Sequence, residues 1–472
     1  MNDQKVPLLQ KFGFLIGMGG SVTVFNLTTM FAMLFFTDLM GLNPAAVGTM
    51  LLIAKIIDAV FDPLCGALID RTNTRFGKVR PWVFIGAIIT FIVGILVFVV
   101  PGFSDNGKLV WSFVTYTGVN LAFTACTLGI ITSIPLITTS QLERVSLSAY
   151  QYIGQTAFSI VTTIIIMPLI TYFSQTAPLS AYWKTSLIVG GIGLVGTLFF
   201  VFVIKENKFE SQTGGGEGVK VPLSASLLSL VKNKYFLILC IIVITTGIAT
   251  AMHQSALAQY LIYGLKAPEL ASALMPLLYI GAFVAALLAK PLARFDKLRM
   301  AKLSFLIVAF GLGLRFFTGD ATMLIVIAGE VILGLGAGLF SVYVLTLLMD
   351  TIEYGYLKNG TRNDGLIMST LSFQQKIGQG VGISIMGFWL AASGYVSGAP
   401  EQSEAVADAL FNIHLLPLLI TSILSLIVLQ LFYKLDAKTV EGIISDIKAR
   451  DEAAAEGAAS AVPEAMQDGE ES

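Results

Sequence analysis

Long apolar segments recur along this chain, and they constrain its fold more than any other feature. A membrane-spanning helix needs about 20 mostly apolar residues, because lipid offers no hydrogen-bond partners and a helix bonds its own backbone groups. With 55% hydrophobic and only 12% charged residues, the chain could not cover the surface of a soluble protein. We therefore predict an all-α membrane protein with twelve transmembrane helices, over residues 12–37, 45–69, 81–101, 110–137, 147–173, 184–204, 235–263, 269–292, 301–318, 322–348, 365–395 and 405–433.

The positively charged residues predict the orientation of the chain. Most of the 29 lysines and arginines fall in residues 1–11, in the loops after even-numbered helices, and in the tail that begins at Lys434. Cytoplasmic loops carry such an excess. Both termini are therefore expected in the cytoplasm of a multi-pass protein of the plasma membrane, the inner membrane in a bacterium, with lipid around it. The net charge of −1 argues against a nucleic-acid-binding protein.

A polar segment with three consecutive glycines, residues 214–216, divides the chain into two halves. We predict an N-terminal six-helix bundle in residues 1–204, a cytoplasmic linker in 205–234, a C-terminal six-helix bundle in 235–433, and a cytoplasmic tail in 434–472. The end of this tail, from Ala449, has no apolar face and is expected to be disordered.

A weak repeat relates the two halves. The basic residues in 70–80, after the second helix, are echoed by those in 294–299, after the eighth. This favours a transporter in which two bundles rock around a central site. The alternative is that both loops merely follow the charge bias of cytoplasmic segments.

The second predicted helix carries three charges, Lys55, Asp58 and Asp62, within an arc of about 60°. Facing lipid, each would cost roughly 2.5–3.5 kcal/mol, so they should face the protein interior. Two carboxylates one turn apart cannot both ionise cheaply there unless a cation or proton lies between them. This favours a coupling site for H⁺ or Na⁺, because Lys55 alone leaves one acid uncompensated. The alternative is a fixed pair between Lys55 and Asp58, with Asp62 at the helix end.

Other charged or titratable residues stand inside predicted helices. Lys376 could be a mobile counter-ion or a charge that links the two halves, and the alternative is a snorkelling lysine. Glu330 is expected to be a local structural acid, and His253 and His414 to be isolated packing or cavity residues. Nothing resembles a nucleophile, a metal cluster, a cofactor loop or an ATP-binding loop, so we expect neither an enzyme nor a resident cofactor.

Several motifs together resemble the glycoside–pentoside–hexuronide:cation symporters, a branch of the major facilitator superfamily that includes the melibiose and glucuronide carriers. The similarity covers nearly all of residues 10–435, and its most specific parts are residues 37–42, 58–63, 70–82, 350–355 and 373–378. The resemblance implies the major facilitator fold and symport of a small sugar-like solute with H⁺ or Na⁺ by alternating access.

The resemblance also implies roles for individual residues. Cation binding is expected at Asp58, Asp62 and Thr124, and charge coupling at Lys376. Apart from the resemblance, the buried charge of Lys55 leads us to expect charge coupling there as well. A cytoplasmic gate, in which ion pairs join the two halves, is expected to comprise Arg144, Asp350, Glu353 and Arg362. The alternative for these last four is a solvated loop.

The sequence also departs from the family pattern. Phe61 stands where the melibiose carriers have an asparagine, which removes one oxygen ligand and favours H⁺ over Na⁺. The family's sugar-binding acids align with Val22 and Thr127, and an arginine aligns with Tyr152. The solute is therefore expected to bind to some of these polar residues, the others having packing roles: Asn26, Asn120, Thr127, Tyr152, Gln155, Ser372, Gln374 and Gln375.

The predicted function is cation-coupled symport of a glycoside, pentoside or hexuronide by a protein that works as a monomer. One alternative is a cation-coupled transporter of a non-sugar metabolite, because the usual sugar-binding acids are absent. A less favoured alternative is a transport-inactive receptor or scaffold of the same fold, which need not keep such costly buried charges.

Overall fold

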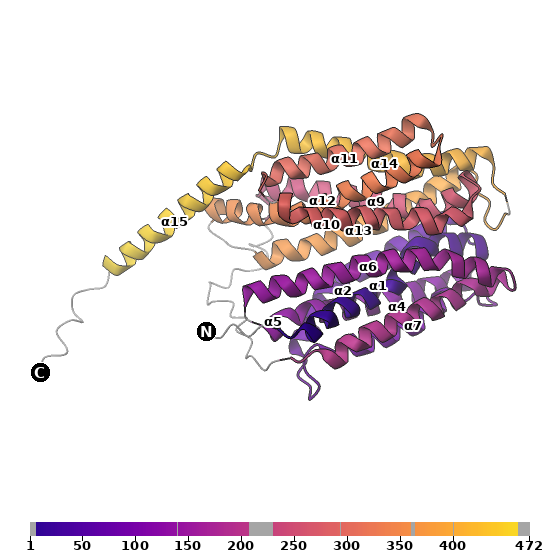
Figure 1. The fold of residues 1–472 in the computed structure, drawn as a ribbon, viewed down its shortest axis with the longest axis horizontal. Helices are drawn as coiled ribbons and strands as arrows, with labels where there is room; N and C mark the ends of the chain where they lie inside the picture. The colour runs from indigo at the N-terminus through magenta and orange to yellow at the C-terminus, as the bar shows by residue number, and fades with distance from the viewer. Residues whose placement is uncertain are drawn as a thin grey trace, which may run out of the picture.

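The computed structural model describes residues 6–138, 140–206, 230–292, 294–359, 364–399 and 401–460. Within these ranges the regular elements are helices, and a single β-bridge joins Thr74 and Gly77. Figure 1 shows two groups of long helices lying side by side, one built by the first half of the chain and the other by the second. The predicted all-α fold with two helix bundles is confirmed.

The N-terminal bundle contains α1 (Leu8–Leu34), its π-helical continuation η1 (Phe35–Leu39), α2 (Pro44–Arg71), α3 (Arg80–Val97), α4 (Asp105–Thr132), the short α5 (Ile134–Ile137), α6 (Gln141–Ser174) and α7 (Pro178–Val203). The C-terminal bundle contains α9 (Lys234–Gln259), its π-helical continuation η2 (Tyr260–Gly264), the 3₁₀ turn η3 (Pro268–Leu270), α10 (Ala271–Leu292), α11 (Lys297–Thr318), α12 (Met323–Asn359), α13 (Asp364–Ala392) and α14 (Glu404–Leu431). Ten helical segments in the described ranges are long and apolar enough to cross a membrane, and α2 and α13 complete the twelve long helices.

A further helix, α15 (Ala437–Ser460), follows α14 and extends away from the bundles (Figure 1). The prediction of disorder from Ala449 is therefore wrong as far as Ser460. Alanine, glutamate, lysine and arginine are strong helix formers, and they dominate this stretch although it lacks an apolar face. The predicted linker lies mostly outside the described residues.

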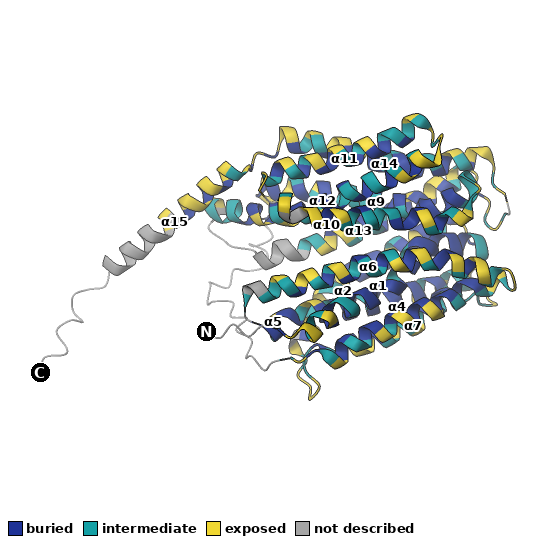
Figure 2. Ribbon diagram, in the orientation of Figure 1, coloured by how far each residue is buried: buried dark blue, intermediate teal, exposed yellow. Residues whose placement is uncertain are grey.

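The outer surface of the bundles suits contact with lipid. Exposed residues line the outward sides of the helices in Figure 2, and many of them are large and apolar. Val195 is 70% exposed and Phe202 is 76% exposed, for example. Water would penalise such a surface, whereas lipid tails do not.

Close helix contacts inside a bundle depend on small residues. A Cβ atom on Gly154 of α6 would lie 1.9 Å from the carbonyl oxygen of Leu15 in α1, so only glycine fits there. Such positions let backbones approach closely where lipid supplies no hydrophobic drive for association.

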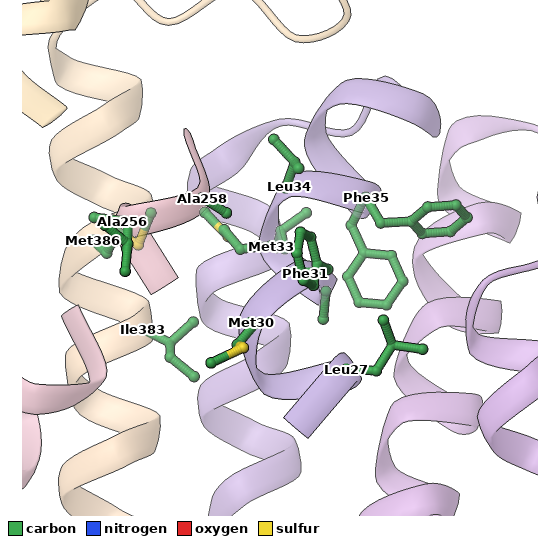
Figure 3. Close-up of a cluster of buried hydrophobic side chains, with 14 of the residues drawn as sticks. Leu27, Met30, Phe31, Met33, Leu34, Phe35, Ala256, Ala258, Ile383 and Met386 are labelled. Atoms are coloured by element: carbon green, nitrogen blue, oxygen red, sulfur yellow. The ribbon is translucent and has the colours of Figure 1, made fainter. Parts of the chain in front are cut away.

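The two bundles meet through α2 against α13 and α6 against α10. At one end of the molecule a buried apolar cluster spans both bundles. Figure 3 shows side chains of α1, α9 and α13 that belong to this cluster, among them Met33, Ala258 and Met386. We call this end the latch face, and the other end, where α1 begins and α14 ends, the terminal face.

Candidate functional site

The buried charges of α2 meet a lysine from the other bundle. The Nζ atom of Lys376 in α13 lies 2.9 Å from Asp58 Oδ1 and 2.5 Å from Asp62 Oδ1. The same ammonium donates a hydrogen bond to Thr124 Oγ1 in α4, at 2.8 Å. The Thr124 hydroxyl in turn donates to Asp58 Oδ1, also at 2.8 Å. We call this group the carboxylate site, and it joins the two bundles.

Lys55 has a different main partner. Its Nζ atom donates to Asn120 Oδ1 at 2.7 Å and lies 3.9 Å from Asp58 Oδ2, at the limit of an ion pair. The Lys55 side chain is only 2% exposed, so its charge still acts on Asp58 through a medium of low dielectric. Asn120 thus positions a lysine in this structure.

The charges of the carboxylate site cancel. Lys55 and Lys376 together balance Asp58 and Asp62, so both acids are compensated in this arrangement without a further cation. From the sequence we expected Lys55 to be the only positive charge beside the two acids, which would leave one acid uncompensated. Lys376 comes from a helix far away in the sequence, and only the packing of α13 against α2 brings it here.

Two of the eight predicted solute contacts line a cavity of about 580 Å³ in the C-terminal bundle, namely Gln155 of α6 and Gln375 of α13. A third, Ser372, donates to Asp62 Oδ2 at 2.8 Å and so belongs to the carboxylate site. Tyr152 is partly buried in α6.

The remaining four predicted contacts are engaged in or between helices. Asn26 donates to Ser159 Oγ, and Thr127 to the carbonyl of Phe123 in its own helix. Gln374 donates to the sulfur of Cys240. The fourth, Asn120, holds Lys55 as described above.

The cavity has polar residues that the sequence analysis missed. Thr246, Thr250 and Gln254 of α9 line it, and their spacing of four residues places them on one helix face. This polar stripe in an apolar helix was the signal that could have found them. Phe305 and Phe340 add aromatic surface. The described lining residues include no Asp, Glu, Lys or Arg, so the cavity is polar but almost uncharged.

Two of the four predicted gate residues, Asp350 and Arg144, have described partners within their own bundles. Lys297 Nζ lies 2.5 Å from Asp350 Oδ1, and both belong to the C-terminal bundle. Arg144 donates from Nε to the carbonyl of Thr138 in the N-terminal bundle. Glu353 is partly buried in α12, and Arg362 lies outside the described residues.

A second set of polar contacts between the bundles lies at the latch face. The Tyr263 hydroxyl of η2 donates to Asp38 Oδ2 of η1 at 2.6 Å, and Tyr395 donates to Asp38 Oδ1. Gln259 donates to Thr37 at 3.4 Å. Both bundles thus contribute a π-helical turn to this contact, and such turns are frequent at functional sites.

A second buried charge cluster was also missed. Glu330 lies 3.4 Å from His253 and 3.3 Å from His414, and it contacts the guanidinium of Arg315. The prediction that both histidines are isolated is wrong. The cluster is assembled from residues of four helices, so no spacing along the sequence indicates it.

The whole chain matches known transporters. Residues 13–437 match the family model described as MFS/sugar transport protein. The chain belongs to this family. It is 30% identical over 441 residues to the isoprimeverose transporter of Lactiplantibacillus pentosus, covering 92% of this chain and 90% of the relative. It is 29% identical to a putative glycoside/cation symporter of Escherichia coli, covering 93% and 94%.

The fold agrees with this assignment. A solved D-xylose-proton symporter superposes with a TM-score of 0.63 at 12% identity, over 90% of this chain and 97% of that structure. The chain is therefore a multi-pass membrane transporter and not an enzyme. The predicted family and the predicted major facilitator fold are confirmed.

Proposed function

We propose that this MFS/sugar transport protein carries an uncharged sugar or glycoside into the cell together with one monovalent cation, H⁺ in preference to Na⁺. The observation that carries the proposal is the position of Lys376 between Asp58 and Asp62. Lys376 occupies the place that a coupling cation needs, and it belongs to the opposite bundle.

Charge counting supports one cation for each cycle. When the bundles move and Lys376 leaves, the two acids and Lys55 carry a net charge of −1. A single H⁺ or Na⁺ restores neutrality, and a site of low dielectric strongly favours that restoration. Lys376 and the coupling cation therefore compete for the same carboxylates, and each stabilises a different arrangement of the bundles.

The solute is coupled to this exchange through α13. Gln375, which lines the cavity, is the chain neighbour of Lys376, and Gln155 reaches the same cavity from the N-terminal bundle. A solute that bonds both glutamines draws the bundles together and changes the position of α13. Solute and cation then favour the same rearrangement, which is the thermodynamic requirement for symport.

The cavity favours a neutral solute. Its amide and hydroxyl groups suit sugar hydroxyls, and its two phenylalanines suit the apolar face of a sugar ring. A hexuronide would bring a carboxylate, for which the described lining residues offer no lysine or arginine. Among the predicted classes we therefore favour pentosides and neutral glycosides.

The proposal takes the terminal face as cytoplasmic, as the distribution of basic residues predicts. The sealed latch face then corresponds to an arrangement that is closed to the outside of the cell. Phe61 supplies no oxygen at the carboxylate site, which favours H⁺ because a proton needs a single carboxylate oxygen. A monomer contains both bundles and hence the whole site.

Uptake into proteoliposomes tests the proposal. Pentosides, neutral glycosides, hexuronides and non-sugar anions are offered under separately imposed H⁺ and Na⁺ gradients, and we expect accumulation of a neutral sugar under the H⁺ gradient. Accumulation of only a non-sugar solute would support the alternative of a transporter for a non-sugar metabolite. If no solute is transported, a transport-inactive receptor or scaffold is favoured.

Two substitutions test the cation site. Asp58→Asn and Asp62→Asn should each abolish gradient-driven accumulation while the protein still inserts. Asp105→Asn is the matched control, because the Asp105 side chain is 82% exposed and lies far from the buried charges along the chain. Accumulation at the wild-type level in both buried variants would refute the assignment.

A further inference from the structure

The second buried charge cluster lies entirely within the C-terminal bundle, and the proposed function makes no use of it. Four helices contribute to it: His253 comes from α9, Arg315 from α11, Glu330 from α12 and His414 from α14. None of these side chains is more than 1% exposed. The two imidazole rings stack with their centroids 4.0 Å apart and an angle of 17° between their planes.

The backbone fixes one proton on each histidine. Nδ1 of His253 lies 2.8 Å from the carbonyl oxygen of His414, and Nδ1 of His414 lies 3.1 Å from the carbonyl oxygen of His253. A carbonyl oxygen can only accept a hydrogen bond, so each Nδ1 must carry a hydrogen. The state of each ring is then decided at Nε2.

Arg315 decides the state of His414. Its Nη1 atom lies 3.1 Å from His414 Nε2 and also bonds Glu330 Oε1. A guanidinium can only donate, and Arg315 Nη1 lies closer to His414 Nε2 than Glu330 Oε1 does, at 3.1 Å against 3.3 Å. We therefore assign His414 Nε2 as the acceptor, which makes this ring neutral. The remaining donors of Arg315 hold Asp320, with Nε 2.9 Å from Oδ1 and Nη2 2.7 Å from Oδ2. Asp320 also accepts from the hydroxyl of Tyr260 at 2.9 Å.

One pair of atoms in the cluster is left without a hydrogen bond. His253 Nε2 and Glu330 Oε2 face each other at 3.4 Å, and both are buried with no hydrogen-bond partner. Two bare acceptors would repel each other, and an unpaired buried polar group is costly. A single proton placed between them satisfies both atoms, as an imidazolium donating to a carboxylate or as a carboxylic acid donating to an imidazole.

The charge balance requires the same proton. Arg315 contributes one positive charge, whereas Asp320 and Glu330 contribute two negative charges. With both histidines neutral the cluster would carry −1 in the interior of a membrane protein, and one proton brings the sum to zero.

A metal ion fits this group poorly. His253, Glu330 and His414 offer ligand atoms within 4.8 Å of one another, which is compatible with a metal site by composition. However, the guanidinium of Arg315 already contacts two of these three ligands, so a fixed cation occupies the position that a metal would need. A proton requires no such space.

We propose that His253 and Glu330 share one proton and form a proton-binding site in the C-terminal bundle, separate from the carboxylate site on α2. His253 also borders the 580 Å³ cavity, beside Gln254. The site therefore lies where solute binding can sense its occupancy. This inference goes beyond the proposed symport, because it needs neither a known solute nor any cation at Asp58 and Asp62.

The chain has only two histidines, which makes a direct test possible. The purified full-length transporter is labelled with ¹⁵N-histidine, and the ring nitrogens are observed by NMR from about pH 5 to pH 9. A second sample carries ¹³C-glutamate, and infrared spectroscopy detects the carbonyl band of a protonated carboxylic acid. The Glu330→Gln variant assigns the signals of the site.

We expect the ring of His414 to be neutral at every pH, with its hydrogen on Nδ1. The pair of His253 and Glu330 should hold its shared proton near neutral pH, either as a doubly protonated His253 ring or as a protonated Glu330. Glu330→Gln should remove the infrared band or convert the second ring to a singly protonated form. Two neutral rings together with an ionised Glu330 across the whole pH range would overturn the proposal, and so would two doubly protonated rings.

The Asp58→Asn variant separates this inference from the proposed function. It should leave both histidine signals and the Glu330 band unchanged, because Asp58 belongs to the N-terminal bundle and both histidines and Glu330 belong to the C-terminal bundle. A histidine titration that disappears in Asp58→Asn would show that the proton belongs to the carboxylate site, and would overturn the assignment to His253 and Glu330. Loss of uptake in Asp58→Asn with intact histidine signals would leave the two proposals standing independently.

Discussion

Replacing Lys376 by glutamine tests whether this lysine is the internal competitor of the coupling cation. In the variant the carboxylate site keeps Asp58, Asp62 and Lys55 and carries a net charge of −1. Removing one partner of a buried ion pair costs about 3–5 kcal/mol. Because Lys376 and Asp62 are 17% and 16% exposed, we expect the lower end, roughly 3 kcal/mol.

The loss of folding stability in Lys376→Gln should depend on pH and on added cations. The folded variant gains by binding one proton that the unfolded chain does not bind, so its stability should fall as pH rises. The wild-type site is neutral without that proton, so the stability of the wild-type protein should depend less on pH. A difference of about 3 kcal/mol corresponds to a change of roughly a hundredfold in the ratio of folded to unfolded protein, which thermal unfolding in detergent at a series of pH values can measure.

Two controls make the result interpretable. Lys376→Arg keeps the charge and should restore most of the stability, whereas Lys108→Gln removes a lysine whose contacts lie outside the carboxylate site. If Lys376→Gln were as stable as the wild type at every pH, the acids would not need Lys376, and competition between this lysine and the cation would be refuted. A loss of stability that no pH or cation relieves would show a purely structural lysine.

Two further predictions concern the latch face. Tyr263→Phe removes a hydrogen bond to the partly buried carboxylate of Asp38, worth about 1.5–3 kcal/mol, and should shift the bundles toward an open latch face. Spin labels at the start of α4 and before α14 should report longer distances, and an unchanged distance distribution would contradict this role. In Gly387→Val the added Cβ atom would lie 2.5 Å from the carbonyl oxygen of Pro44, so the closed latch face should be destabilised and uptake should fall at least tenfold. Gly66→Ala is the control, because a Cβ atom at Gly66 meets nothing within 4 Å. Full uptake by Gly387→Val would contradict the prediction.

The sequence predicted the fold well because the membrane imposes a simple rule. Each apolar run must become a helix that satisfies its own backbone, so hydropathy alone located the twelve long helices. The rule has no force outside the membrane, and there the prediction was wrong. Helix propensity carries α15 through Ala449 to Ser460, although the stretch has no apolar face.

The candidate site was only partly predictable, for a geometric reason. Asp58 and Asp62 lie one turn apart on a single helix, so their proximity follows from helical periodicity. Their contact with Lys376 depends on how two bundles pack, which no local pattern encodes. The same holds more strongly for His253 and Glu330, since their cluster draws on four helices and looks like scattered single residues in the sequence.

The two buried clusters reach neutrality in different ways, and this difference gives each one a separate pH response. In the carboxylate site Lys376 supplies the second positive charge, so the described arrangement is neutral and takes up an external cation only when the bundles separate. In the cluster of the C-terminal bundle Arg315 cannot balance both acids, and the missing charge must come from a proton even while the latch face is closed. Raising the pH should therefore remove this proton and disturb the C-terminal bundle without any bundle movement that exposes Asp58 and Asp62.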